Sequence, residues 1–382
     1  MSSIKQLIEQ KQFTTFEELK FFFSQSPYSF EIKEHGQLYM MCFTEDSDTA
    51  LEAVREATGI IIEKYTNKVV HYSFKKCYDS LENNSIDFTT IDNQETVIEL
   101  DSFKVSNLSK NYIVNLFFEG SLIKMYHYNG EWHIATSKSI NEDNKWSSNK
   151  TFQDLFKESV KDSFGVDYLE FKTKLDPGYS YTFILQHPEN NTIHSVSQKL
   201  IFILNKVNLD TLEEEIPDIY NFTVEKTIEE LTNCEGPVNE NFIIYNMDSE
   251  GKVVSRVKIL NNKFRILSKL RGNFPDIGLR YLEVLGNTDI TDALLEKFSS
   301  QSEKFKSIDF KFEKTCKDIL RLYKETKIKH LDSHVPDEFK RTLFQMHAKY
   351  KNTKIPVNIS DISLKLMSLN PRTLSTVIGY RY

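Results

Sequence analysis

The side chains that most often hold metals or attack substrates are widely spread in this sequence. No two of its four cysteines have the spacing of metal ligands; they are Cys42, Cys77, Cys234 and Cys316. We therefore expect buried thiols in a reducing compartment rather than a zinc site. The histidines His71, His127, His133 and His194 form no ligand pattern, and we assign them structural roles.

One run of residues points to chemistry. Residues 117–123 read Phe-Phe-Glu-Gly-Ser-Leu-Ile. They follow a strand expected over 112–116 and precede strands expected over 122–128 and 132–136, because aromatic and β-branched residues with Gly between them are typical of a meander. Taken alone, Glu119 and Gly120 would indicate only a hairpin turn.

The run resembles the motif Lys-x-Asp/Glu-Gly-Ser-Leu-Ile of covalent nucleotidyltransferases, and in particular of the RNA ligase 1 family, the T-even phage tRNA-repair type with its large-virus and eukaryotic relatives. In that family the first residue is the lysine that becomes adenylylated, and here it is Phe117. Other segments resemble the family in the same order: 56–61, 73–78, 183–193 and 256–273. The resemblance implies an α+β fold, with an ATP-grasp-like nucleotidyltransferase domain of antiparallel sheets and helices before an all-helical domain.

The resemblance also assigns roles, and three positions have lost the side chain that the family uses. Thr58 stands where an arginine grips a phosphate, Phe117 where the lysine attacks, and Ile184 where a glutamate binds the nucleotide. A threonine has no charge and no fork of donors. Phe117 has no lone pair with which to attack a phosphorus atom. We therefore predict that none of these positions is catalytic.

A nucleotide-binding remnant follows from the same resemblance. It consists of Lys76, Glu119, Lys138, Glu240, Arg256 and Lys258. Glu235 is the alternative to Glu240 as the family's motif glutamate. Lys124 could replace the missing nucleophile, but strand alternation gives it the opposite parity to Phe117, so we consider this a remote alternative. We expect no metal site and no certain cofactor; ATP and Mg²⁺ would bind only if nucleotide binding is retained.

Helical periodicity dominates the end of the chain. Apolar residues recur at helical spacing from about residue 289 onward, so we predict a nucleotidyltransferase domain over 1–288 and a helical domain over 289–382. No apolar run approaches 18 residues and the first twelve residues are polar, so we expect no membrane span, no signal peptide and a cytoplasmic protein.

The charge of the chain is unevenly distributed. Residues 250–382 hold 26 Lys and Arg against 15 Asp and Glu, whereas residues 1–249 hold 22 against 40. This asymmetry suggests RNA as a partner for the basic C-terminal third. Solvated lysine-rich helix faces would give the same count, and a protein partner is also compatible with it.

These observations favour a catalytically degenerate RNA ligase-like protein, a pseudo-ligase that binds or scaffolds RNA, a nucleotide or a protein partner. Two alternatives stay open. One is an active ATP-dependent RNA ligase that joins RNA ends through a covalent lysyl-AMP intermediate. The other is a structural protein of a large DNA virus.

Overall fold

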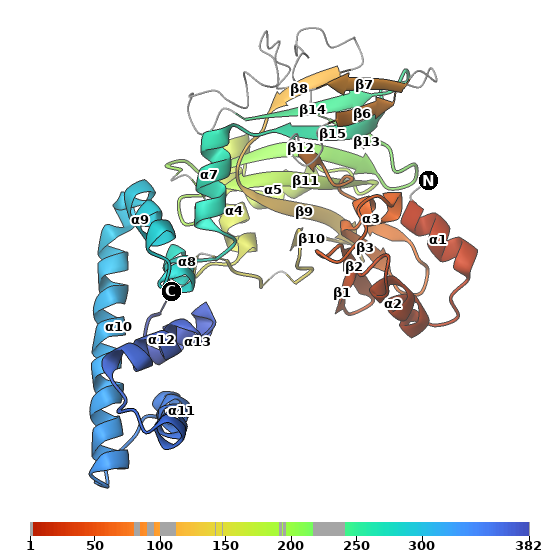
Figure 1. The fold of residues 1–382 in the computed structure, drawn as a ribbon. Helices are drawn as coiled ribbons and strands as arrows, with labels where there is room; N and C mark the ends of the chain where they lie inside the picture. The colour runs from red at the N-terminus through yellow and green to blue at the C-terminus, as the bar shows by residue number, and fades with distance from the viewer. Residues whose placement is uncertain are drawn as a thin grey trace. The chain divides into compact units, whose positions relative to one another are not determined.

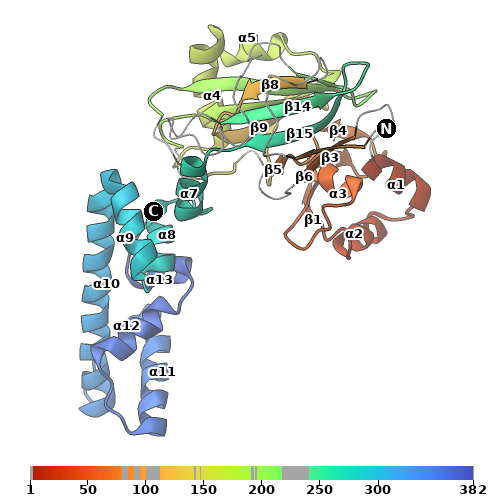
Figure 2. The ribbon, with the colours of Figure 1, turned by 45° about the horizontal axis from the view of Figure 1, so that its top comes forward.

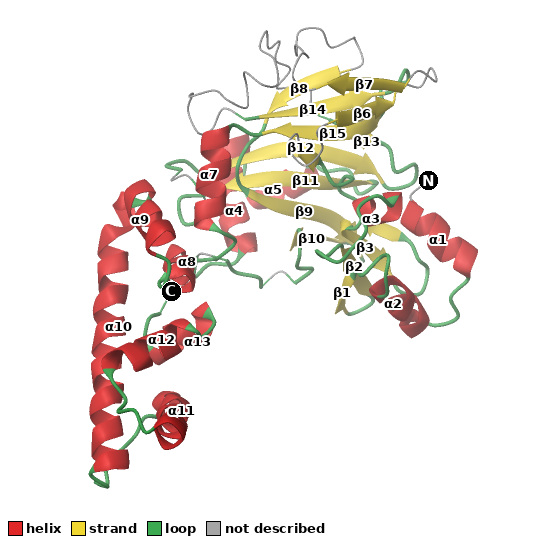
Figure 3. Cartoon of the chain, in the orientation of Figure 1, coloured by secondary structure: helices red, strands yellow, loops and turns green. Residues whose placement is uncertain are grey.

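The structure is a computed structural model that describes residues 3–79, 85–89, 95–99, 112–141, 143–146, 148–190, 193, 196–216 and 241–381. These residues form a mixed α+β fold whose sheets are antiparallel except for one short parallel pairing, with helices over the last third of the chain (Figure 1 and Figure 3). Contacts divide the chain into two compact units, Met1–Arg265 and Ile266–Tyr382.

The first unit begins with a sheet of order β1-β2-β3-β4. Its strands are β1 (Glu31–His35), β2 (Leu38–Cys42), β3 (Thr58–Glu63) and β4 (Val69–His71). The helices α1 (Ser3–Lys11), α2 (Phe16–Ser24) and α3 (Glu52–Glu56) bury apolar residues such as Ile4, Phe23 and Tyr39 in one core with it. Thr15 caps α2 by accepting a hydrogen bond from the Glu18 N–H.

The central sheet has the order β10-β9-β11-β12-β13. Its strands are β9 (Ser121–Tyr128), β10 (Glu131–Thr136), β11 (Tyr179–Gln186), β12 (Leu200–Asn208) and β13 (Glu214–Glu215). The helices α4 (Phe152–Phe164) and α5 (Tyr168–Thr173) lie beside this sheet (Figure 2). They bury Phe156 and Phe171 against Phe183 of the sheet. The strands expected over 122–128 and 132–136 are thus present as β9 and β10.

Strand β9 is covered on both sides, which matters for the site. Ile123 and Met125 pack in the core with α4, whereas Tyr126 packs with β2 and β3. Successive side chains of a strand point to opposite faces. Residues of both parities on β9 are therefore buried.

A third sheet has the order β5-β15-β14-β8, and β6 pairs with β7 in a separate two-stranded sheet. The strands are β5 (Tyr78–Asp79), β6 (Ser85–Thr89), β7 (Glu95–Glu99), β8 (Tyr112–Leu116), β14 (Phe242–Met247) and β15 (Val253–Ile259). Helix α7 (Asn262–Arg271) follows and contains the division between the units. The 112–140 region thus supplies β8 to this sheet and β9 and β10 to the central one.

The second unit is helical. It contains α8 (Ile277–Val284), α9 (Thr288–Lys297), η3 (Ser299–Gln301), α10 (Ser302–Tyr323), the π-helical turn η4 (Lys324–Ile328), α11 (Asp337–Thr353), α12 (Ile359–Met367) and α13 (Pro371–Val377). Helix α8 packs in the core of this unit through Tyr281 and Leu282, so contacts place the division at 265/266 rather than after the predicted residue 288. None of the helices in the described part of the chain is long and apolar enough to cross a membrane.

Candidate functional site

Two adjoining cavities lie within the first unit. One, of about 190 Å³, is mainly apolar and is lined by Phe74, Cys77, Leu116, Phe117, Phe118, Gly120, Leu122, Ile184, Leu204, Ile243, Arg256 and Lys258. The other, of about 350 Å³, is lined by Cys42, Phe43, Ala57, Thr58, Ser73, Phe74, Lys76, Cys77, Leu122, Lys124, Ser137, Lys138, Lys258 and Leu260. Phe74, Cys77, Leu122 and Lys258 line both. We call the two cavities the apolar lobe and the lysine lobe of one cleft.

Most positions that the motif resemblance singled out lie around this cleft. Of the three substituted positions, Phe117 and Ile184 line the apolar lobe and Thr58 lines the lysine lobe. Of the remnant, Lys76 and Lys138 line the lysine lobe, Arg256 lines the apolar lobe and Lys258 lines both. Segments far apart in the sequence therefore converge on one place.

Glu119 and Glu240 do not join this group. The Glu119 carboxylate accepts a hydrogen bond from the Ile193 N–H (2.6 Å), and its carbonyl accepts one from Gln186 Nε2 (2.7 Å), so Glu119 braces its own turn. Glu240 and its alternative Glu235 lie outside the described residues.

Phe117 is held firmly at the wall of the apolar lobe. Its N–H donates to the Asn241 carbonyl (2.8 Å), and its ring meets Phe264 edge-on at 6.1 Å between centroids. The Lys258 amine lies 5.3 Å from the Phe117 ring centroid, within range of a cation–π interaction. The position that the motif resemblance aligns with the nucleophile is thus occupied by an aromatic side chain in the cavity wall.

Gly120 shows why the motif needs a glycine. A Cβ at this position would lie 2.6 Å from Ile184 Cγ2 and 2.6 Å from the Leu185 carbonyl oxygen. Ile184 itself is buried and pairs with Leu122 on β9. The turn after Phe117 therefore lies directly against β11, which no residue with a side chain would allow without displacement of the backbone.

Lys124 is the charged residue that sequence reasoning undervalued. It lies on β9 with 1% of its surface exposed, and its Nζ donates to the carbonyls of Thr58 (2.6 Å) and Gly59 (2.8 Å). Burial lowers the pKa of its amine to about 8. The signal that could have revealed it is a lysine inside an otherwise apolar strand, between Ile123 and Met125.

The surroundings of Lys124 are shaped to receive it. Gly59 has φ +92°, and a Cβ there would collide with the Lys124 amine and lie 2.7 Å from the Ser137 carbonyl oxygen. Burial raises the pKa of the neighbouring Cys42 thiol. Burial, with the Lys124 charge as a second cause, holds the pKa of His71 well below its usual value. Lys124 is thus the cation among neighbours that stay neutral near pH 7.

Arg256 serves the architecture. It is 5% exposed, forms an ion pair with Glu214, and lies 5.0 Å from the Phe74 ring and 5.3 Å from the Tyr245 ring. Its guanidinium thereby joins β15 to the β12–β13 hairpin. In the described part of the chain, Lys124, Lys138 and Lys258 form no ion pair with a carboxylate.

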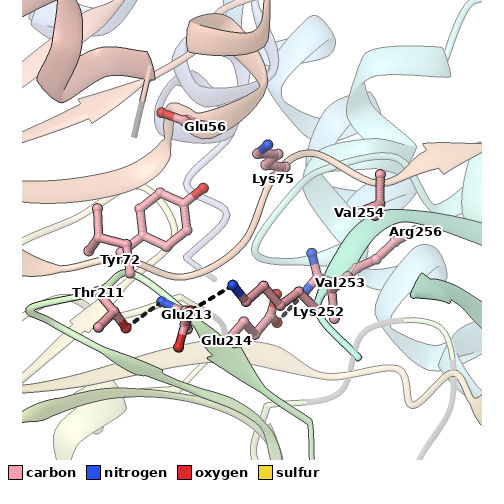
Figure 4. Close-up of a pocket in the computed structure, with 11 residues that line it drawn as sticks. Glu56, Tyr72, Lys75, Thr211, Glu213, Glu214, Lys252, Val253, Val254 and Arg256 are labelled. Carbon is pink, nitrogen blue, oxygen red and sulfur yellow. Dashed lines mark hydrogen bonds and ion pairs between the residues drawn. The ribbon is translucent and has the colours of Figure 1, made fainter. Parts of the chain in front are cut away.

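Arg256 also lines a further pocket of about 270 Å³ (Figure 4). Its charges are matched within the protein: Figure 4 shows Lys252 paired with Glu213, and Arg256 paired with Glu214. Glu56, also in this pocket, accepts hydrogen bonds from the first backbone N–H groups of α1. This pocket offers little unmatched charge to a ligand.

Only one group among the described residues has metal-ligand spacing, namely Glu158, His187 and Glu189. Lys150 pairs with both carboxylates (2.8 and 2.7 Å), and Lys199 pairs with Glu158 (3.0 Å). The Lys150 and Lys199 hydrogen bonds lower the pKa of Glu158 to about 2. The two lysines thus already provide the positive charge that a metal would bring.

Comparisons with known proteins identify distant viral relatives. No family model matches the chain. An "Immediate-early protein ICP-46 homolog" of Invertebrate iridescent virus 3 is 22% identical over 286 residues, which are 72% of this chain and 61% of that protein. The homolog of Invertebrate iridescent virus 6 is 21% identical over 314 residues, 71% of this chain and 68% of that protein.

A third viral relative is from Autographa californica nuclear polyhedrosis virus, and its name calls it a candidate bifunctional polynucleotide kinase/RNA ligase. It is 24% identical over 233 residues, which are 56% of this chain but only 32% of that protein. The chain thus spans less than two thirds of the first of these relatives and about a third of this one.

Solved structures with partial similarity are ligases. A candidate ATP-dependent DNA ligase from Aquifex aeolicus has a TM-score of 0.38 at 11% identity and covers 88% of this chain and 80% of its own. An archaeal ATP-dependent RNA ligase has 0.37 at 11% identity, over 98% and 79%. Naegleria gruberi RNA ligase with PPi has 0.29 at 11% identity, over 41% and 51%. All three TM-scores are below 0.5.

Proposed function

We propose that this protein is a catalytically degenerate RNA ligase-like protein that binds phosphate groups of a nucleotide or an RNA end in the cleft. The observation that carries the proposal is convergence: Thr58, Phe117 and Ile184 line the same cleft as Lys76, Lys138 and Lys258. These positions are up to 200 residues apart in the sequence, and the motif order alone had linked them. This convergence supports a cleft in which lysines can bind phosphate while Phe117 offers no nucleophile.

The two lobes suit the two parts of a nucleotide. The aromatic and aliphatic walls of the apolar lobe can hold a base by stacking and burial. The amines of the lysine lobe can hold phosphate oxygens in a partly dehydrated site, where charge interactions are stronger than in water.

The residues present fit ATP better than they fit Mg²⁺. The described lining residues of both lobes include no carboxylate, and carboxylates are the usual protein ligands of Mg²⁺. We therefore propose phosphate binding that relies on lysine charge. When bound, Mg²⁺ would supply further charge neutralisation of the phosphates.

Partners and origin are part of the same proposal. The relative named as a candidate bifunctional polynucleotide kinase/RNA ligase supports RNA as the partner, and the basic last third of the chain is compatible with it. We propose a viral origin because the three relatives are viral proteins. We also propose a cytoplasmic location, since Cys42, Cys77 and Cys316 are free thiols.

The test is intact-mass spectrometry after incubation with ATP and Mg²⁺, with wild-type protein beside Phe117→Lys, and equilibrium dialysis of both with ATP. We expect wild type to bind ATP without gaining an AMP adduct. An adduct on Phe117→Lys alone would support a cleft that is intact around one lost group. An adduct on wild type would establish the active-ligase alternative, and failure of wild type to bind either ATP or 5′-phosphorylated RNA would overturn the proposal.

A further inference from the structure

Position 58 has no charged side chain, but the amine of Lys124 lies beside its backbone. Thr58 has an uncharged side chain, whose hydroxyl donates to the Phe74 carbonyl (2.6 Å). The Lys124 amine, which comes from the neighbouring central sheet, lies 2.6 Å from the backbone carbonyl of this same residue. A cation therefore stands at the backbone of position 58, although the sequence places it 66 residues away.

Within the described part of the chain, no carboxylate forms an ion pair with Lys124. Its Nζ contacts two backbone carbonyls, and the described residues that line the lysine lobe include no carboxylate. A buried cation is expensive unless an anion and hydrogen bonds compensate it. The carbonyls supply the hydrogen bonds, so the missing component is negative charge.

The lobe offers room for that charge beside further cations. Lys76, Lys138 and Lys258 line the same 350 Å³ cavity as Lys124. An anion there would meet several amines at once, and its charge would remove the cost of burying the protonated Lys124. Phosphate oxygens, which accept several hydrogen bonds, suit such a cluster of donors.

We propose that Lys124 replaces the cation that position 58 lacks, and that the lysine lobe binds a phosphate group against the protonated Lys124 amine. This inference rests on the proposed function, because it names the residue that completes the phosphate site of the same cleft. The phosphate can belong to a nucleoside triphosphate or to a 5′-phosphorylated RNA end.

The proposal makes phosphate binding depend on pH in a defined way. The free amine of Lys124 loses its proton around pH 8, and a bound phosphate favours the protonated form. Cys42 and His71 face Lys124 and stay neutral, because burial raises the thiol pKa and lowers the imidazole pKa. The remaining charges facing the lobe are Lys76, Lys138 and Lys258. If only the protonated form bound phosphate, a single group of pKa about 8 would weaken binding about eightfold between pH 7.5 and 9, and this is the upper limit of the effect.

The experiment measures the affinity of the full chain for metal-free ATP by isothermal titration calorimetry at pH 7.5 and 9, with EDTA present. The variants are Lys124→Gln, which keeps an N–H donor without charge, and the double variant Lys124→Gln with Thr58→Arg. Lys174→Gln is the matched control, since it removes one lysine charge at an exposed ion pair with Glu170 in the same unit. Parallel titrations use RNA with a 5′-phosphate and the same RNA with a 5′-hydroxyl.

We expect Lys124→Gln to bind ATP at least about tenfold more weakly at pH 7.5 and to show a smaller pH dependence than wild type. The double variant should recover affinity, and Lys174→Gln should match wild type. Tighter binding of 5′-phosphate than 5′-hydroxyl RNA would assign the lobe to an RNA end; a preference for ATP alone would assign it to the nucleotide.

Two results would overturn the inference while leaving the proposed function intact. The first is that Lys124→Gln binds ATP with the same affinity and the same pH dependence as wild type. The other is a double variant that binds no better than Lys124→Gln. If Lys124→Gln does not fold, the pH profile of wild type tests the inference instead. A wild-type affinity for ATP that does not fall between pH 7.5 and 9 rules out a role for the Lys124 proton. If wild type binds neither ATP nor phosphorylated RNA, the proposed function itself fails.

Discussion

Replacement of Glu214 by Gln tests the ion pair that joins β15 to the β12–β13 hairpin. The Arg256 side chain is 5% exposed and the Glu214 side chain 11% exposed, so the pair is almost completely removed from water. Asn205 Nδ2 also donates to the Glu214 carboxylate (2.5 Å). Glutamine keeps the shape of glutamate but leaves the guanidinium of Arg256 without an opposite charge.

The size of the effect follows from this burial. Removal of one partner of a buried ion pair typically costs 3–5 kcal/mol, and we expect about 3 kcal/mol here because Glu214 keeps slight contact with solvent. For a unit of this size, 3 kcal/mol corresponds to a fall in Tm of about 6–12 °C. The adjacent Glu215 provides the control, since its pair with Lys206 is 49% and 40% exposed. Glu215→Gln should cost less than about 1 kcal/mol.

Tryptophan fluorescence is the suitable assay. Both tryptophans of the chain, Trp132 and Trp146, pack against the core of the central sheet. Urea and thermal unfolding followed by their emission therefore report on the first unit alone. Arg256→Met should cost less in the Glu214→Gln background than in wild type, because the uncompensated charge is already there. Equal midpoints for Glu214→Gln and Glu215→Gln would refute the reasoning.

Two further predictions concern the cleft and the helical unit. A thiol reagent should label Cys77 before Cys42 and Cys316, because these two residues are only 3% and 2% exposed. Bound ATP should slow the labelling of Cys77, because this residue lines both lobes. Peptide mapping measures the labelling, and an equal rate with and without ATP would contradict the prediction. Burial raises the pKa of Asp276, but hydrogen bonds from Lys304 and Tyr380 outweigh it and hold the pKa below its usual value. Asp276 therefore stabilises the helical unit above its unfolded pKa of about 4, and this contribution is lost as pH falls through the lower folded pKa. Circular dichroism melts of Asp276→Asn should lose less stability than wild type between about pH 5 and 3; parallel losses would contradict it.

The sequence predicted much of the local structure because its signals are local. Helical spacing from about residue 289 onward predicted the helices that follow α8 in the second unit. Alternating aromatic and β-branched residues predicted β8, β9 and β10. Periodicity cannot say which core a helix joins, so the predicted boundary left α8 with the first unit.

The motif order predicted which positions belong together, whereas tertiary packing decided what two of them do. Glu119 fits the motif, yet its carboxylate accepts a hydrogen bond from the Ile193 N–H, 74 residues along the chain. Arg256 lies at a position that is basic in the resembled motif, yet it forms a buried ion pair with Glu214. Both partners are remote in the sequence, and no spacing rule identifies them.

Lys124 shows most clearly which features depend on tertiary packing. From the sequence, it lay on a strand with the wrong parity to replace Phe117. In the structure, β9 is covered by α4 on one side and by β2 and β3 on the other, so side chains of both parities are buried. The sequence by itself predicted most of the strands and helices and their order, because these depend on neighbours in the chain, and it set the residue types at positions 58, 117 and 184. Only the tertiary structure decided that Lys124 meets the carbonyl of Thr58, because that contact depends on how two sheets pack.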